Sequence, residues 1–388
     1  MITNDVLKNN ISLYFLSLFF YNAGRTVPHA ILTILLLDSG ISLVQITIIQ
    51  IVYMIVVTLF EIPSGYIADN WSRKKMYFIS IIFLFISYLI VYIYHELFYM
   101  LIFSWSLYAL STVSFTGTVD NEIVNQLKEK KVNIKNFLIK QSYIIYISAS
   151  ISAILGSLLY VSFQERIYIL SFILLFFSFI SIIFFKENNK TNHKLRDYKV
   201  TFKDEIRFLL NDNNLVNYIV LYIALAFFYQ PFYQYWQVVF ENKNFDISYF
   251  GFFYVVFNII SIIANWIYSK INFEFKHIPV LIILIGFLSL VTFTVSNKFL
   301  FLLLFLLMVM LTSLYSLDLQ VRVRKYSNPE NISLISALMG TGNTLGSFLV
   351  LFLLVWTLDY FTIEINYLVY FLIFVSITLF SLLFKNKK

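Results

Sequence analysis

The chain has 388 residues, of which 60% are hydrophobic and only 13% are charged, and it carries a net charge of +7. Soluble domains have about 45–50% apolar and about 25% charged residues, so this composition excludes a soluble enzyme, and it also excludes a disordered chain. It indicates an integral membrane protein. No cysteine is present, which excludes disulfides and thiolate metal sites.

Long apolar runs follow one another along the chain, each close to the roughly 20 residues that cross a bilayer as a helix. The sequence therefore predicts an all-α membrane protein with twelve transmembrane helices. The first run is too long for the core of a signal peptide, so we expect it to be retained. The expected spans lie near 11–37, 42–63, 76–94, 97–118, 140–161, 166–185, 215–239, 247–268, 278–296, 299–318, 332–356 and 364–384.

The cationic residues predict the orientation. With a cytoplasmic N-terminus, 24 of the 28 Lys and Arg fall in inside segments, and only Arg166, Lys243 and Lys298 fall outside. Cytoplasmic loops of membrane proteins carry such an excess of Lys and Arg. We therefore expect a multi-pass protein of a bacterial plasma membrane with both termini in the cytoplasm. The same distribution explains the net charge, so no nucleic acid partner is expected.

The longest polar stretch, 186–214, lies at the middle of the chain, with six expected spans before it and six after it. This arrangement predicts an N-terminal six-helix half over 1–185, a cytoplasmic linker over 186–214 and a C-terminal six-helix half over 215–388. Two such halves are typical of transporters built from structural repeats. The prediction rests on hydropathy and topology, because the two halves share no obvious sequence repeat.

A short charged motif stands between the second and third spans. Gly65 is followed four residues later by Asp69, and four residues after that by Arg73 and Lys74. This pattern resembles the cytoplasmic signature of the major facilitator superfamily. The residues directly after Asp69 and directly before Arg73 depart from the family pattern, which usually has Arg and Gly there.

The resemblance implies the fold of that superfamily, with two six-helix halves, transport by alternating access and a monomeric state. It also implies that the four motif residues latch the two halves together on the cytoplasmic side. Asp120 and Glu122, at the inner end of the fourth span, are the candidate partners for Arg73. The alternative is an ordinary charged loop that obeys the positive-inside rule.

Residues 117–122, which read Gly-Thr-Val-Asp-Asn-Glu, also resemble a motif of drug-exporter-like members of the superfamily in Gram-positive bacteria. This resemblance implies proton-coupled export of a hydrophobic or amphipathic small molecule, such as a drug, an antibiotic or a peptide-like compound. The exporter signature of the fifth span contains Pro and paired Gly, and 151–159 lacks it. The direction of transport therefore stays open.

Polar residues within the first span are candidates for the substrate cavity, because ionisable groups at membrane depth are rare and mark functional sites by default. Asn22, Arg25 and His29 occur at i, i+3 and i+7, so we expect them to share one helix face that looks into the protein. The alternative is a structural Arg25 that bonds to carbonyl groups or extends toward the outer surface.

A second stripe of candidates lies on the seventh and eighth spans. Gln230, Gln234 and Gln237 recur at i, i+4 and i+7 beside Trp236, and Asn258 follows on the next span. Amides beside aromatic rings can bind a bulky amphipathic solute. The alternatives are aromatic packing near the outer interface and hydrogen bonds between neighbouring helices.

Signals for catalysis are negative. The four histidines lie far apart, without metal-ligand spacing, and no phosphate-binding glycine loop ends in Gly-Lys-Ser/Thr. We therefore expect no catalytic residue, no metal and no cofactor. A polytopic transferase is the rival from another class, and it would show a catalytic His or an acidic pair at a membrane face.

The candidates for proton coupling are His29, Glu61 and Asp120, since no carboxylate lies at the centre of a span. Only His29 lies deep in a span with an ordinary pKa in the physiological range. The two carboxylates lie toward the cytoplasmic ends, where a wetted cavity would have to reach them. The rival within transport is a carrier for an anionic solute that uses Arg25 as its counter-charge.

Overall fold

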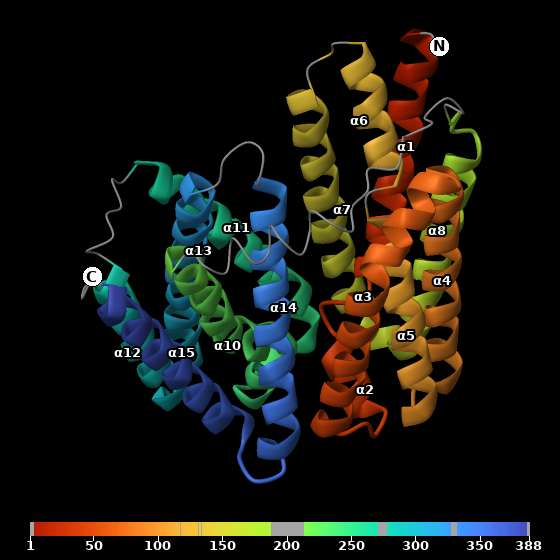
Figure 1. Ribbon diagram of the computed structural model, residues 1–388. Helices are drawn as coiled ribbons and strands as arrows, with labels where there is room; N and C mark the ends of the chain where they lie inside the picture. Colours follow the sequence, from red (N-terminus) through yellow and green to blue (C-terminus); the bar gives the residue numbers. More distant parts are fainter. Residues whose placement is uncertain are drawn as a thin grey trace. The chain divides into compact units, whose positions relative to one another are not determined.

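In the computed structural model, every regular element of the described residues is helical (Figure 1). The structure describes residues 4–116, 118–130, 132, 134–187, 213–270, 278–326 and 332–385. The chain divides into two compact units, one of Met1–Lys194 with Asp246–Val255 and one of Leu195–Phe245 with Val256–Lys388. The expected linker lies mostly outside the described residues, and its bounds stay a prediction.

The first unit is built from apolar helices. Because a membrane offers no water to the backbone N–H and C=O groups, each helix pairs these groups within itself. Within this unit α1 packs on α7 and α8, and α5 packs on α3 and α4. Its elements are α1 (Asn4–Thr26), α2 (Leu32–Asp38), α3 (Leu43–Asn70), α4 (Arg73–Tyr94), α5 (Phe98–Phe115), α6 (Val119–Glu129), α7 (Ile134–Phe163), a 3-10 turn η1 (Gln164–Arg166), α8 (Ile167–Ile183) and a second 3-10 turn η2 (Ile247–Tyr249).

In the second unit α10 packs on α14 and α15, and α12 packs on α13 and α15. Pro231 lies inside α10, and α11 begins within the stretch assigned to the first unit. The helices are α10 (Asn213–Asn242), α11 (Phe250–Lys270), α12 (Ile278–Thr294), α13 (Lys298–Tyr326), α14 (Ile332–Thr357) and α15 (Ile363–Lys385).

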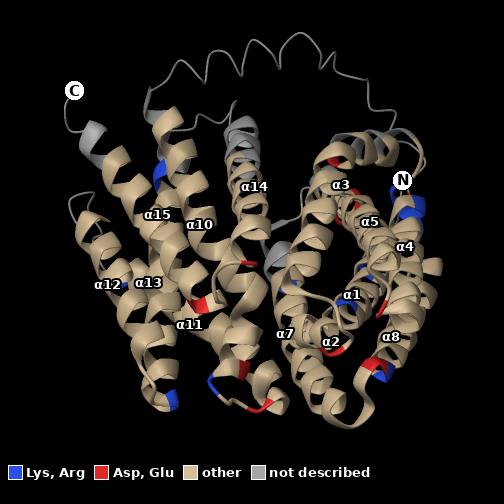
Figure 2. Cartoon of the chain, turned by 90° about the horizontal axis from the view of Figure 1, so that it is seen from below, with Lys and Arg blue, Asp and Glu red and all other residues tan. Residues whose placement is uncertain are grey.

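Eight helical stretches among the described residues are long and apolar enough to cross a membrane, and two shorter apolar helices lie at Ile278–Thr294 and Gly342–Thr357. One of the eight stretches, Lys140–Ile183, runs over both α7 and α8, which correspond to two separate expected spans. Most of the length of each helix is free of charged residues (Figure 2). The all-α membrane architecture is confirmed, and the count of twelve spans stays a prediction.

The first expected span, 11–37, is not one helix. α1 ends at Thr26, and α2 begins at Leu32 after a turn in which the His29 N–H donates to the Thr26 carbonyl at 2.9 Å. Pro28 explains the break, because proline has no N–H to donate and its ring clashes with the preceding turn of a helix. His29 therefore lies in the turn, and the expectation that it shares a continuous helix face with Arg25 is wrong.

Small hydroxyl side chains fix α1 against its neighbours. Ser17 donates to the Ser178 carbonyl of α8 at 2.9 Å, and its Oγ lies 3.1 Å from the Tyr77 hydroxyl of α4. Ser178 in turn donates to the Ser17 carbonyl at 2.9 Å. Buried hydroxyls that find such partners avoid the cost of an unpaired polar group. These bonds set the register of α1, and with it the position of Arg25 two turns further along.

The turn after α1 rests directly on α7. A Cβ added at Gly156 would lie 1.8 Å from the carbonyl oxygen of Val27, a distance that no pair of unbonded atoms adopts. Only glycine fits here, because its missing side chain lets the two backbones touch. Gly156 therefore supports the turn that carries His29.

Gly156→Ala should lower the free energy of unfolding by about 1–3 kcal/mol, the usual cost of forcing extra volume into a packed site. The added methyl group would have to push the backbone at Val27 away from α7. Thermal unfolding in detergent measures the change, with Leu155→Ala on the exposed face of α7 as the control. Equal stability of the two variants would contradict the contact.

Candidate functional site

Arg25 lies at the C-terminal end of α1 and is half-buried. Its Nε donates to the hydroxyl of Tyr108 on α5 at 2.7 Å, and its Cζ lies 5.3 Å from the centre of the Tyr108 ring. Tyr88 of α4 donates to the Arg25 carbonyl at 2.6 Å. Two tyrosines from two other helices therefore fix both the backbone and the side chain of this cation.

His29 reaches the same tyrosine from the turn after α1. Its Nε2 lies 3.1 Å from the Tyr108 hydroxyl, so the imidazole and the guanidinium share one phenol oxygen. Beside them is a cavity of about 10 Å³, which is lined by His29, Tyr88, Tyr108 and the buried Tyr168 among others. A cavity of this size holds at most one water molecule.

Two further tyrosines extend the aromatic surface around Tyr108. The Tyr53 ring of α3 lies 5.3 Å from the Tyr108 ring, and the Tyr53 hydroxyl donates to Thr112 at 3.3 Å. Tyr88 stacks against Tyr108 at 6.1 Å. The tyrosine cluster, defined here as Tyr53, Tyr88 and Tyr108, therefore centres on the Tyr108 ring that lies beside the Arg25 guanidinium.

No counter-charge neutralises Arg25 within the described part of the chain. The ion pairs there join Arg73 to Glu122 and Arg322 to Asp318. Of the five guanidinium N–H donors, only the Nε group donates to a described protein acceptor. A cation held without a carboxylate at membrane depth is costly.

Asn22 departs from the expected cavity face. Its Nδ2 donates to the Ile145 carbonyl at 2.8 Å and to the Ser148 hydroxyl at 2.9 Å, both on α7. The amide therefore joins two helices, as polar side chains commonly do within membranes. A cavity role for the rest of the half-buried Asn22 side chain stays a prediction.

The candidate cavity residues of the second unit differ in how deeply they are buried. Trp236 is buried and lies edge-on against Phe240 at 5.4 Å and Phe257 at 5.1 Å, so it belongs to the aromatic core. A cavity-lining role for its ring stays a prediction. Gln237 is also buried, whereas Gln230, Gln234 and Asn258 are half-buried. A cavity role for these amides stays a prediction.

The charged motif forms a separate cluster within the first unit. Arg73, at the start of α4, pairs with Glu122 of α6 at 3.1 Å, and Gln126 donates to the other oxygen of Glu122 at 2.8 Å. Asp120, the second candidate partner, lies half-buried in the first turn of α6, and Glu61 is exposed on α3. Gly65 and Asp69 lie within α3, and the Asp69 side chain is outside the described part.

The other half of the motif ties α4 to the end of α8. Lys74 Nζ donates to the Ile183 and Phe185 carbonyls at 2.6 and 2.7 Å. In the reverse direction, the Arg73 backbone N–H donates to Glu187 Oε1 at 2.7 Å. Each charge thereby complements a helix dipole, with the cation at a C-terminus and the carboxylate at an N-terminus.

Asn10 of α1 secures the same segment. It accepts from the Lys186 N–H at 3.0 Å and donates to the Lys186 carbonyl at 2.8 Å. Asn10 and Glu187 could not be identified from the sequence, because each forms hydrogen bonds with residues more than 100 positions away. No local pattern signals such contacts.

The second unit has an ion pair of its own on α13. Arg322 Nε donates to Asp318 at 2.6 Å, and Tyr268 of α11 donates to the other oxygen of that buried carboxylate at 3.0 Å. The spacing of four residues places both charges on one helix face. This spacing could have revealed the pair in the sequence, although the tyrosine could not have been inferred.

Long apolar helices, an isolated deep cation and buried ion pairs together define a polytopic membrane protein with a polar interior. The family model of the Major Facilitator Superfamily matches residues 14–351, and the chain belongs to this family. No curated protein sequence matches the chain. Among the described residues, no three His, Asp or Glu side chains gather in a way that could hold a metal ion.

Solved structures of transporters share the fold. The nucleoside transporter NupG has a TM-score of 0.69 and 13% identity, covering 98% of each chain. A bacterial homologue of the iron transporter ferroportin, in an inward-facing state, has a TM-score of 0.71 and 14% identity, covering 96% of this chain and 98% of its own. A D-xylose-proton symporter has a TM-score of 0.72 and 11% identity, covering 98% of this chain and 97% of its own. Family and fold identify a membrane transporter of small molecules rather than an enzyme.

Proposed function

We propose that this transporter carries an anionic, amphipathic small molecule and recognises its negative group through Arg25. The observation that carries the proposal is the guanidinium, which is fixed by one hydrogen bond to Tyr108 and has no carboxylate partner among the described residues. Its remaining N–H donors suit the two oxygens of a carboxylate or a phosphate. The first unit therefore supplies the counter-charge for the solute.

The tyrosine cluster supports the amphipathic part of the proposal. Its rings offer apolar surface at little entropic cost. The hydroxyl oxygens of Tyr53 and Tyr88, whose hydrogens bond to Thr112 and to the Arg25 carbonyl, can accept from the solute. Transport proceeds by alternating access, in which one site near the middle of the membrane opens to each side in turn. The solute replaces the water that would otherwise hydrate Arg25, so binding and desolvation occur together.

The second candidate is proton-coupled export of a hydrophobic or amphipathic compound with no charge, as in the drug-exporter-like subgroup of Gram-positive bacteria. The contact that favours coupling is the 3.1 Å approach of His29 to the hydroxyl that also binds Arg25. A proton gained by the imidazole would place two cations on one phenol oxygen. Protonation would therefore weaken the hold of Tyr108 on Arg25 and link the proton to the solute site.

Counterflow in proteoliposomes separates the two candidates. The panel should contain one amphipathic skeleton as its carboxylate, its neutral amide and its amine. We expect the carboxylate to exchange fastest, because only this compound places a negative charge on Arg25. Faster exchange of the neutral amide would overturn anion recognition, and equal rates for all three would do the same.

Single substitutions of His29, Glu61 and Asp120 by Gln or Asn test the proton-coupling candidates. A coupling residue should abolish transport driven by a proton gradient but spare counterflow, because counterflow needs no net proton movement. We expect this split for His29→Gln and not for Glu61→Gln, whose parent side chain is exposed. His95→Gln serves as the control. If all three variants keep gradient-driven transport, the carrier is a uniporter or uses another ion.

The proposed orientation in the membrane follows the positive-inside pattern of the sequence. We propose a plasma-membrane location with both termini in the cytoplasm, a monomeric carrier and two six-helix halves joined by the linker at 186–214. Labelling of a single cysteine introduced at either terminus, carried out on intact cells, tests the orientation. Labelling by an impermeant reagent from outside would reverse it.

A further inference from the structure

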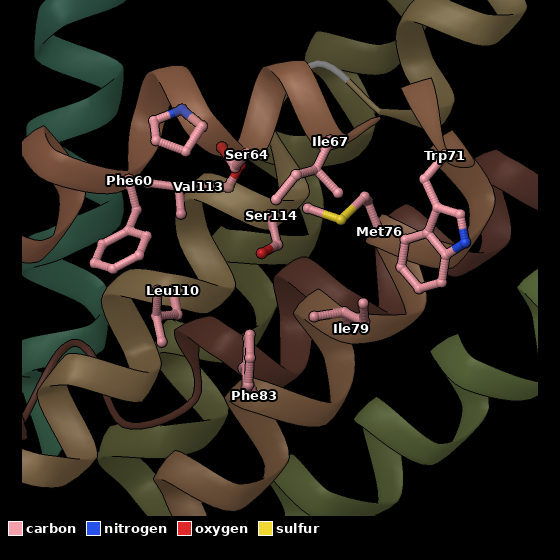
Figure 3. A pocket seen from close by; sticks show the side chains of 11 residues that line it. Phe60, Ser64, Ile67, Trp71, Met76, Ile79, Phe83, Leu110, Val113 and Ser114 are labelled. Carbon is pink, nitrogen blue, oxygen red and sulfur yellow. The ribbon is translucent and has the colours of Figure 1, made fainter. Parts of the chain in front are cut away.

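An apolar groove runs along the surface of the first unit between α3 and α4, with α5 as its floor (Figure 3). Its volume is about 260 Å³. The groove exists because α5 packs closely against both helices, whereas α3 and α4 make few contacts with each other. Figure 3 shows Phe60 at one end of the groove and Trp71 at the other. Phe60 lies on α3 and Trp71 caps its C-terminal end, so at about 1.5 Å per residue the two positions are roughly 16 Å apart.

The wall of the groove consists almost entirely of hydrocarbon. Its polar lining residues are Ser64 and Ser114. The Ser64 hydroxyl shares its one hydrogen between the Glu61 carbonyl at 2.9 Å and the Val113 carbonyl at 3.0 Å. A polar solute would lose hydrogen bonds to water here and gain few in return. A hydrocarbon chain would lose nothing and would gain close contacts with both helices.

The end of the groove at Trp71 has a different character. The Trp71 side chain is 56% exposed, and the Lys75 ammonium lies 5.0 Å from the centre of its ring. In the described part of the chain, neither this ammonium nor the indole N–H has a hydrogen-bond acceptor or an acidic partner. Two donors, one of them charged and neither with an acceptor among the described residues, therefore stand at the end of an apolar groove.

We propose that this groove is a binding site for an anionic phospholipid. One acyl chain lies between α3 and α4, and the phosphate accepts from Lys75 and from the Trp71 indole. Tryptophan at the level of the headgroups and lysine beside anionic lipids are arrangements that membrane interfaces favour. The site lies outside the Arg25 cluster, so it does not depend on the transported solute.

Native mass spectrometry of the full-length protein tests the site with phosphatidylglycerol and phosphatidylcholine of identical acyl chains. The unmodified protein should retain phosphatidylglycerol in preference to phosphatidylcholine. Lys75→Gln should reduce this preference about fivefold, which corresponds to the roughly 1 kcal/mol that one lysine contributes beside an anionic lipid. Ile79→Trp, which fills the groove from α4, should reduce retention of both lipids.

Lys186→Gln is the matched control, because Lys186 is an exposed lysine at the same end of the unit that does not line the groove. It should leave the preference unchanged. An unaltered preference in Lys75→Gln, or a loss as large in Lys186→Gln, would overturn the headgroup assignment. Full lipid retention in Ile79→Trp would overturn the acyl-chain site.

Discussion

Removing one partner of the Arg73–Glu122 ion pair should lower the free energy of unfolding by about 3–5 kcal/mol. The side chains of Arg73 and Glu122 are only 9% and 2% exposed, and their charged atoms lie 3.1 Å apart. Arg73→Met removes the cation that pairs with the buried Glu122 carboxylate, and Glu122→Leu removes the carboxylate that pairs with the buried Arg73 guanidinium. Either variant therefore bears a desolvation cost that the pair offsets.

The double variant gives the sharper result. Arg73→Met combined with Glu122→Leu removes both charges, and apolar replacements of a buried pair are often neutral or stabilising. We therefore expect the double variant to be more stable than either single variant, which is a clear departure from additivity. Thermal unfolding in detergent measures all three.

Lys75→Met, on the exposed side of the same helix, should change stability by no more than about 0.5 kcal/mol. If the single variants at Arg73 and Glu122 are no less stable than this control, the pair does not stabilise the first unit. A purely additive double variant would show that the two charges act independently.

Arg25→Gln should raise the half-saturating concentration for an anionic solute by about 30-fold or more. Truncating one partner of a hydrogen-bonded charge pair costs about 2–5 kcal/mol, and each 1.4 kcal/mol is about a factor of ten. Exchange of the neutral amide should change little, because it makes no ionic contact with Arg25. Counterflow with both compounds measures this difference in selectivity.

Arg25→Lys separates charge from geometry. Lysine keeps the positive charge, but it lacks the planar fork that binds Tyr108 through Nε and leaves two N–H pairs for the solute. We expect an intermediate loss for the anionic solute. Arg166→Gln, in the η1 turn, is the control and should behave like the unmodified protein. Equal effects of Arg25→Gln on the anionic and the neutral compound would remove Arg25 from the solute site.

The fold class could be predicted because it depends on composition and on the length of apolar runs, both of which are local properties. The break after Thr26 was within reach as well, since Pro28 lies in the middle of the expected first span. Hydropathy alone predicts one continuous span here, because it reflects the apolar side chains around Pro28 and not the missing backbone N–H group.

The site could be predicted only in part. Arg25 is identifiable because a lone cation in an apolar run is rare. Tyr108 is not, because it is one of 28 tyrosines and meets Arg25 across 83 positions of the sequence. Similarly, the sequence left Asp120 and Glu122 as equal candidates for Arg73, and only the orientation of α6 brings Glu122 to it. Long-range packing decides both contacts.

The hydrogen bonds around Phe185, Lys186 and Glu187 also have a mechanical consequence. A chain that leaves a helix normally transmits any pull to the last turn of that helix alone. Here the load is shared, because Asn10 holds Lys186 to α1, while Lys74 and the Arg73 backbone hold the same segment to α4. Tension on the segment beyond Glu187 therefore reaches three helices at once. Such an anchor favours displacement of these helices as one rigid body over unravelling of α8.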